Sequence, residues 1–219
     1  MQRLLGGSAS PIGWSVQFLD ATAAAVAQAV AELRRGAELQ TRDGLRYPDS
    51  LGLLLPFVAP WTRELLHPCG SWTAYLNNAV DGGDPTALGP ALARHLDVRC
   101  VVAVHAPRYG PGHQGTQLAV FGPAGTPPLM YERTVSAVAT DGRWEWHEDG
   151  PPLAFEEVGR YTARRVSARF DRALLVDYLL GFGIAVDDDA AYGDGVLVQQ
   201  VVDRPRRTVT LQEARGALG

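Results

Sequence analysis

Apolar residues at intervals of three and four predict three helices in this chain, over residues 20–35, 85–96 and 171–181. Each has a candidate N-cap whose side chain can accept a hydrogen bond from an unpaired backbone N–H: Asp20 or Thr22, Asp84 and Asp171. Residues 153–170 also have a helical period, in part of their length. The helical content of the chain is therefore substantial, and it is spread along the whole sequence.

Apolar and β-branched runs bounded by turn signals predict the strands between these helices. The predicted strands are residues 51–57, 61–66, 71–78, 98–106, 116–122 and 129–140, with a final hairpin formed by 196–202 and 207–211. The run 98–106 is almost continuously apolar, as is typical of a strand covered on both faces. The polar residues 37–50 are predicted to form a loop.

Asp141-Gly142 predicts a two-residue hairpin turn, because both central positions of a type I′ turn need a positive φ. Direct closure of the turn pairs Ala139 with Trp144 and Ala137 with Trp146, so both indoles lie on one face. Large side chains opposite small ones are typical of a sheet face under a covering layer. We therefore interpret the tryptophans as core residues; a ligand-stacking platform is the alternative.

Together these elements predict an α+β fold, in which about three helices cover a mainly antiparallel, twisted sheet. A chain of 219 residues is expected to form a single domain, residues 1–219. Within it, residues 1–50 are a candidate N-terminal appendage, and residues 212–219 are expected to be a frayed tail.

Composition narrows the classes of function. The chain is 46% hydrophobic and 20% charged, which is typical of a globular protein, and no apolar run is long enough for a membrane span or a secretory signal. We therefore expect a cytoplasmic location and no membrane partner. All 20 basic residues are arginines, which excludes Schiff-base chemistry on lysine and a P-loop lysine. The net charge of −4 disfavours nucleic-acid binding.

Motifs for catalysis or metal binding are missing from the sequence. It contains no G-x-S-x-G elbow, G-x-G-x-x-G loop or Walker motif. His105 and His113 have no further ligand at a suitable spacing, and Cys69 and Cys100 have no histidine partners for zinc. We therefore expect no metal and no cofactor, and the sequence leans away from an enzyme.

Two charged segments are candidate binding surfaces for another protein. Asp187, Asp188, Asp189 and Asp194 lie in one acidic loop, which is either simply solvated or a dock for a basic partner. On a helix, five arginines would form two rows: Arg160, Arg164, Arg165, Arg169 and Arg172. These rows are either paired internally with acids such as Glu156 and Asp171 or free to bind an acidic or phosphate-bearing partner, with Arg164, Arg165 and Arg169 as candidate contacts.

Three stretches carry a resemblance: WTAYLNN…DGGDP, DGRWEWHEDGPPLAFEEVGRYTARR…RF and LLVDYLLGFGI. With them the chain resembles, over roughly residues 55–195, a group of uncharacterised bacterial, largely actinobacterial, proteins of similar length. That group is similar in style to the immunity proteins of bacterial toxin systems. The resemblance implies a small cytoplasmic α+β protein without catalytic residues, and it transfers no functional residue to this chain.

The leading hypothesis is therefore a non-enzymatic protein-binding protein, most plausibly an immunity protein that neutralises a bacterial toxin domain by occlusion. The alternative is a small-molecule-binding protein or small enzyme. Its site would lie near Trp72, Asn77, His105 and His147, with Tyr75 and Asn78 close by. The oligomeric state is left open.

Overall fold

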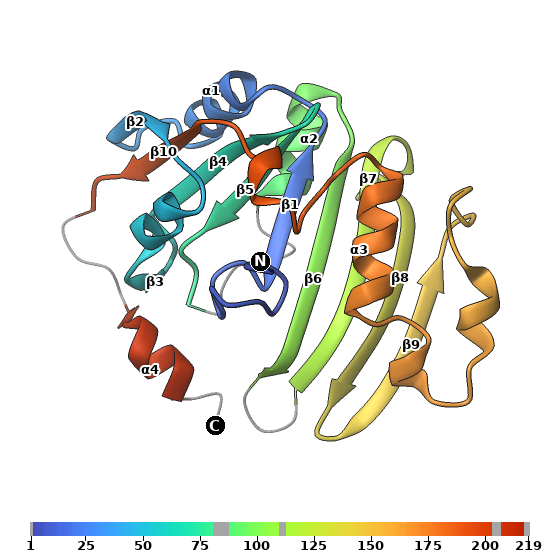
Figure 1. The fold of residues 1–219 in the computed structure, drawn as a ribbon. Coiled ribbons are helices and arrows are strands. Elements are labelled where there is room, and N and C mark those ends of the chain that lie inside the picture. The colour runs from blue at the N-terminus through green and yellow to red at the C-terminus, as the bar shows by residue number, and fades with distance from the viewer. Residues whose placement is uncertain (1, 81–87, 110–112, 203–206, 217–219) are drawn as a thin grey trace.

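One antiparallel sheet of nine strands organises the molecule (Figure 1). The computed structural model describes residues 2–80, 88–109, 113–202 and 207–216. From edge to edge, the strands are β2 (Leu39–Leu45), β10 (Gly195–Gln200), β4 (Arg63–Cys69), β5 (Trp72–Asn77), β1 (Ser15–Leu19), β6 (Cys100–Tyr109), β7 (His113–Thr126), β8 (Tyr131–Thr140) and β9 (Arg143–Asp149). A second, two-stranded sheet pairs β3 (Phe57–Ala59) with β11 (Arg207–Val209). The predicted α+β class with a mainly antiparallel sheet is confirmed.

Helices cover both faces of the large sheet. On one face, here called the α1/α2 face, α1 (Ala23–Leu33) packs against β4 and β10, and α2 (Gly89–Leu96) packs against β1, β6 and β7. On the opposite α3 face, α3 (Arg172–Gly181) crosses over β7 (Figure 1). Each face has its own hydrophobic core. The centre of the sheet is therefore the middle layer of three.

The middle strand of the sheet comes from the first 50 residues. β1 pairs with β5 on one side and β6 on the other, and all five of its side chains are buried. β6 is covered on both faces, with Cys100 and Val102 in one core and Val101 and Ala103 in the other. Residues 1–50, a candidate appendage by sequence, thus contribute β1 and β2 to the large sheet and α1 to the layer that covers it.

Side-chain caps define where two helices begin. Thr22 accepts from the backbone N–H of Ala25 (3.3 Å), and Asp171 accepts from that of Leu174 (3.0 Å), so two of the predicted N-caps are confirmed. The first helix, α1, begins at Ala23, after β1 has ended at Leu19. The predicted cap of the second helix, Asp84, lies outside the described residues.

The β8–β9 hairpin has the predicted register. Asp141 and Gly142 form the turn with φ of 51° and 78°, Ala139 lies opposite Trp144, and Ala137 lies opposite Trp146. Both indoles are partly buried against the core of the α3 face. The ring of Trp146 lies 4.8 Å from that of Tyr161, centroid to centroid, so the tryptophans belong to the packing of that layer.

The predicted strand over residues 51–57 is wrong. Asp49–Leu54 form a short 3-10 helix, η1, and only the end of the segment joins β3. Leu51 and Leu54 are buried while Gly52 is exposed, which is the three-residue spacing that a 3-10 turn produces. A short apolar run does not distinguish a buried helical turn from a strand.

The pairing predicted at the C-terminus is also wrong. β10 lies between β2 and β4, and β11 pairs with β3 in the other sheet, so the two strands form no hairpin. Residues 37–50 were predicted as a loop, but they contain β2, an edge strand whose exposed side chains give no apolar signal. Residues 211–216 form α4 (Leu211–Gly216) where the sequence predicts a frayed tail.

Residues 153–170 form two 3-10 turns, η2 (Val158–Thr162) and η3 (Val166–Ala168), and no α-helix. Val158 of η2 is 49% exposed, so it is not a core residue. Side chains of this layer bind the backbone directly. The Glu156 carboxylate accepts from the N–H of Leu153 (3.1 Å), and the Tyr178 hydroxyl accepts from that of Glu157 (2.9 Å). These tertiary contacts replace the helical hydrogen bonds that the pattern suggests.

A buried ion pair anchors this segment to the sheet. Arg133 of β8 is 2% exposed, and it donates from Nε (2.9 Å) and Nη2 (2.7 Å) to the two carboxylate oxygens of Glu156. Its Nη1 donates to the Gly150 carbonyl (2.7 Å), and the Tyr161 hydroxyl donates to Glu156 (2.8 Å). Glu148 adds a second carboxylate at 3.1 Å, 42% exposed. The buried charges are therefore compensated on nearly every side.

Replacing Glu156 with Gln should strongly destabilise the fold, because it leaves Arg133 buried with only a partly exposed counter-charge. We expect a loss of about 3–5 kcal/mol in the free energy of unfolding, measured by urea denaturation. Glu148→Gln is the matched control on the same guanidinium, and it should cost less than about 1 kcal/mol because Glu148 faces solvent. Equal losses in the two variants would contradict the assignment of Glu156 as the anchor.

Candidate functional site

Ion pairs and hydrogen bonds of two arginines hold the acidic loop against the N-terminal segment. Asp187 receives two hydrogen bonds from Arg172 (2.6 and 2.9 Å), which also donates to the backbone carbonyls of Leu4 and Leu5. Asp189 accepts from Nε of Arg3 (3.0 Å). Two of the four predicted docking carboxylates therefore have arginine partners within the chain.

The other two aspartates of the loop are exposed. Asp188 accepts from the backbone N–H of Ala190 (3.0 Å) and so caps the short helix η4 (Asp189–Ala191). Asp194 follows it, just before β10. The charge left available on the loop is thus about half of what the sequence suggests.

The arginines do not form the two predicted rows, because the segment that carries most of them is not an α-helix. Arg160 pairs with Asp171 (3.1 Å), and Arg169 donates to the Ala163 carbonyl (2.8 Å) while covering the Trp146 ring. Arg164 and Arg165 are exposed between η2 and η3. The structure therefore combines both sequence alternatives, with some arginines paired internally and two facing solvent.

The residues of the alternative site are not brought together. Trp72 lies on β5, His105 on β6 and His147 on β9, and five strand spacings of about 4.8 Å separate β5 from β9. Trp72 is buried and donates to the Phe182 carbonyl (3.0 Å), whereas His147 is exposed. Asn77 is buried and accepts from the backbone N–H of Ala79. These side chains have separate structural roles.

The structure brings together a serine and a histidine that no motif in the sequence connects. Ser50 of η1 lies with its Oγ 2.7 Å from Nε2 of His67, and Nδ1 of His67 lies 2.9 Å from the Gly193 carbonyl. Burial lowers the pKa of His67, and the hydrogen bond to that carbonyl opposes the effect. An oriented histidine beside a serine is the arrangement of an activated nucleophile. Here the serine is 4% exposed and the histidine 0%, so the pair joins η1 to β4 inside the core.

A second polar cluster ties the end of α1 to the sheet. Glu64 of β4 is fully buried, pairs with Arg34, and accepts from Nε1 of Trp61 (3.0 Å). Burial raises the pKa of Glu64, and the Arg34 charge opposes that rise. Within the described part of the chain, the second carboxylate oxygen and the buried hydroxyl of Tyr75 have no hydrogen-bond partner. Its acidic member is fully buried and paired with Arg34, so the cluster serves the contact between α1 and the sheet.

The largest cavity that we describe is an open groove between edge strand β2 and η1. It has a volume of about 300 Å³, and its walls come from β2, β10, β4, η1 and the residue that follows η1. This β2–η1 groove is lined by Gln40, Thr41, Arg42, Gly52, Leu53, Leu55, Arg63, Leu197 and Gln199. The lining contains two arginines and no carboxylate.

The two arginines of the groove differ in their hydrogen bonds and in their exposure to solvent. Arg63 is half-buried, and its Nη1 donates to the carbonyls of Leu53 (2.9 Å) and Leu55. These bonds fix the guanidinium at the inner end of the groove. Arg42 is exposed at the outer end, on the edge strand. The groove therefore presents a hydrogen-bonded cation inside and an exposed one at its mouth.

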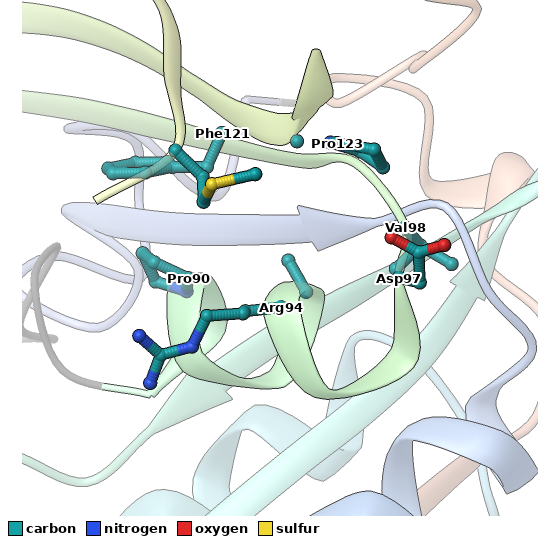
Figure 2. A pocket seen from close by; sticks show the side chains of 9 residues that line it. Pro90, Arg94, Asp97, Val98, Phe121 and Pro123 are labelled. Atoms are coloured by element: carbon teal, nitrogen blue, oxygen red, sulfur yellow. The ribbon is translucent and has the colours of Figure 1, made fainter. Parts of the chain in front are cut away.

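A smaller hollow lies between α2, with the two residues that follow it, and the last part of β7 (Figure 2). Figure 2 shows Arg94 and Asp97 at opposite ends of it, with Phe121 and Pro123 above. Its volume of about 40 Å³ is enough for a few water molecules but not for a metabolite. The groove is therefore the better candidate site.

The chain matches no protein-family model, no curated protein and no solved structure. Across residues 2–80, 88–109, 113–202 and 207–216, no three histidine, cysteine or acidic side chains come together to hold a metal ion. No helix in that same part of the chain is long and apolar enough to cross a membrane. Function therefore has to be inferred from the geometry above.

The half-buried side chain of His105 predicts a pH dependence of stability. Burial, and then the charge of Arg172, lowers the pKa of His105 from 6.5 to about 4. Between those values the unfolded chain binds a proton that the folded chain does not, so this contribution to stability is complete above pH 6.5 and is lost as the pH falls towards 4. Urea unfolding at pH 7 and pH 5 should show a smaller decline for His105→Gln than for wild type.

His147→Gln is the control for this measurement, because His147 lies on the exposed face of β9. Its decline between pH 7 and pH 5 should equal that of wild type. A His105→Gln variant with the wild-type decline would show that another group carries the pH dependence.

Proposed function

We propose that this chain is a non-enzymatic protein-binding protein, and that the β2–η1 groove receives an anionic part of its partner. The observation that carries the proposal is the lining of the groove, which holds Arg42 and Arg63 and no acidic residue. The whole chain has a net charge of −4, so the positive charge of this groove is opposite in sign to that of the molecule. A local charge of this kind selects and orients a partner of opposite charge.

The fixed guanidinium of Arg63 supports this proposal. A charged donor that is already held in place loses little conformational entropy when it binds a carboxylate. The planar fork of arginine also matches carboxylate geometry, which makes such contacts directional. The acidic loop is a weaker dock, because Asp187 and Asp189 already have arginine partners.

A bacterial toxin domain is the partner that the sequence resemblance implies. Within the proposal, an immunity protein would cover the toxin's active surface while the groove holds an acidic element of the toxin. Co-expression with a toxin encoded in the neighbouring gene would test this part, since protection of the host should then depend on Arg42.

Affinity capture from native lysate tests the proposal through matched charge reversals. A partner retained by wild type should be lost by Arg42→Glu, because the reversal repels an anionic group. It should be retained by Arg143→Glu, which makes the same charge change on β9 at the opposite edge of the sheet, where Arg143 is exposed. Raising the salt concentration should also weaken capture.

A double variant, Asp188→Asn with Asp194→Asn, separates the groove from the acidic loop. Capture should persist in this variant. Capture that survives Arg42→Glu but fails in the double variant would overturn the groove and favour the loop as the dock.

A further inference from the structure

The chemistry of the β2–η1 groove restricts what its occupant can be. Besides the two arginines, it presents the amide side chains of Gln40 and Gln199 and the aliphatic side chains of Leu53, Leu55 and Leu197. The matching ligand has one anionic group, one amide-like group that both donates and accepts hydrogen bonds, and one aliphatic group. Leu53 and Leu55 are only partly buried, and a phosphate or a small dicarboxylate would not cover their exposed parts.

The arrangement of these groups follows from the strand register. Gln40 and Arg63 both lie opposite Gln199, so the two amides and the inner arginine form one row across β2, β10 and β4. Arg42 lies opposite Leu197 in the neighbouring row. An amide-bearing chain that enters over β2 therefore passes the two glutamines before it reaches Arg63.

Exposure of the lining residues falls from the β2 edge of the groove towards β4. Gln40 and Arg42 at the β2 edge are exposed, whereas Arg63, Leu53 and Leu55 at the inner end are half-buried. Its volume of about 300 Å³ lies at the lower end of the range for small-molecule sites, which is about 300–1,000 Å³. A groove of this size suits a short piece of chain, and the last residue of a chain carries a carboxylate, a peptide group and a side chain together.

We propose that the β2–η1 groove binds the C-terminal residue of a partner protein, and that this residue has an aliphatic side chain. The α-carboxylate binds Arg63, with Arg42 closing over it from the mouth. The last peptide unit hydrogen-bonds Gln40 and Gln199, and the aliphatic side chain packs on the leucines. Capture of a chain terminus by its carboxylate is an established mode of peptide recognition. The inference rests on the proposed function, because it specifies which part of the partner enters the groove.

Short peptides test this inference without knowledge of the partner. The probes are acetyl-Ser-Gly-Ala-X peptides, in which X is Leu, Ile or Val, with a free C-terminal carboxylate. Binding is measured by calorimetry and compared with that of the same peptides carrying a C-terminal amide. The free acids should bind at least tenfold more tightly than the amides, because a charge-assisted contact is lost in the amide.

Two protein variants locate the binding. Arg42→Gln should weaken binding of the free acids about tenfold. Because Arg42 is exposed, the variant should fold as wild type does, and thermal unfolding checks this. Arg143→Gln removes the same charge at the far edge of the sheet, and its affinity should equal that of wild type. Equal affinity in all three proteins would overturn the site.

One further peptide separates a chain terminus from any other carboxylate. Acetyl-Ser-Glu-Ala-Leu amide carries its charge on an internal side chain and should bind as weakly as the other amides. Binding as tight as that of the free acids would overturn the C-terminal inference, yet leave the groove as an anionic docking site. If Arg42 is needed for capture of the partner but no free-acid peptide binds, the inference fails and the proposed function stands.

Discussion

Burial of the central strands on both faces is the constraint on which the rest of the structure depends. An antiparallel sheet commonly exposes one face to solvent, but here β5, β1 and β6 lie between two hydrophobic cores. Every helix and coil that covers the sheet has to be held against it, and polar groups that enter these layers need partners. Many of the ion pairs and hydrogen bonds in the molecule meet that requirement.

Arginine supplies many of those partners. In a chain without lysine, Arg133 and Arg172 each combine a carboxylate with backbone carbonyls, and so tie a covering segment to another part of the molecule. A guanidinium can do this because it has five donors in a rigid plane. Arg63 differs, because it donates to two backbone carbonyls, those of Leu53 and Leu55, and it lies at the wall of an open groove without carboxylates.

The proposed function follows from that difference. Where an arginine is enclosed with a carboxylate, as with Glu156, its charge is used within the fold. Where it faces a groove without carboxylates, its charge is available to a ligand. The same reasoning weakens the acidic loop as a dock, since Arg3 and Arg172 use half of its carboxylates to hold the N-terminal segment. Asp188, Asp194, Arg164 and Arg165 remain as exposed charges.

The sequence by itself determined the features that depend on neighbouring residues. The caps at Thr22 and Asp171, the helix that begins at Arg172 and the register of the β8–β9 hairpin follow from contacts within a few positions. The class of fold followed as well, because the periods of its apolar positions reflect burial on helices and strands.

Only the tertiary structure decided the strand order and the candidate site. β2 is polar and mostly exposed, so nothing in its own sequence marks it as a strand, and its pairing with β10 joins residues 150 or more positions apart. The walls of the groove form only when β2 pairs with β10 and β10 pairs with β4. They also require the 3-10 helix η1, which the apolar run LGLLLPF does not distinguish from a strand. Local sequence does not record which distant segments come together, because that choice depends on how all the apolar surfaces of the chain are buried at once.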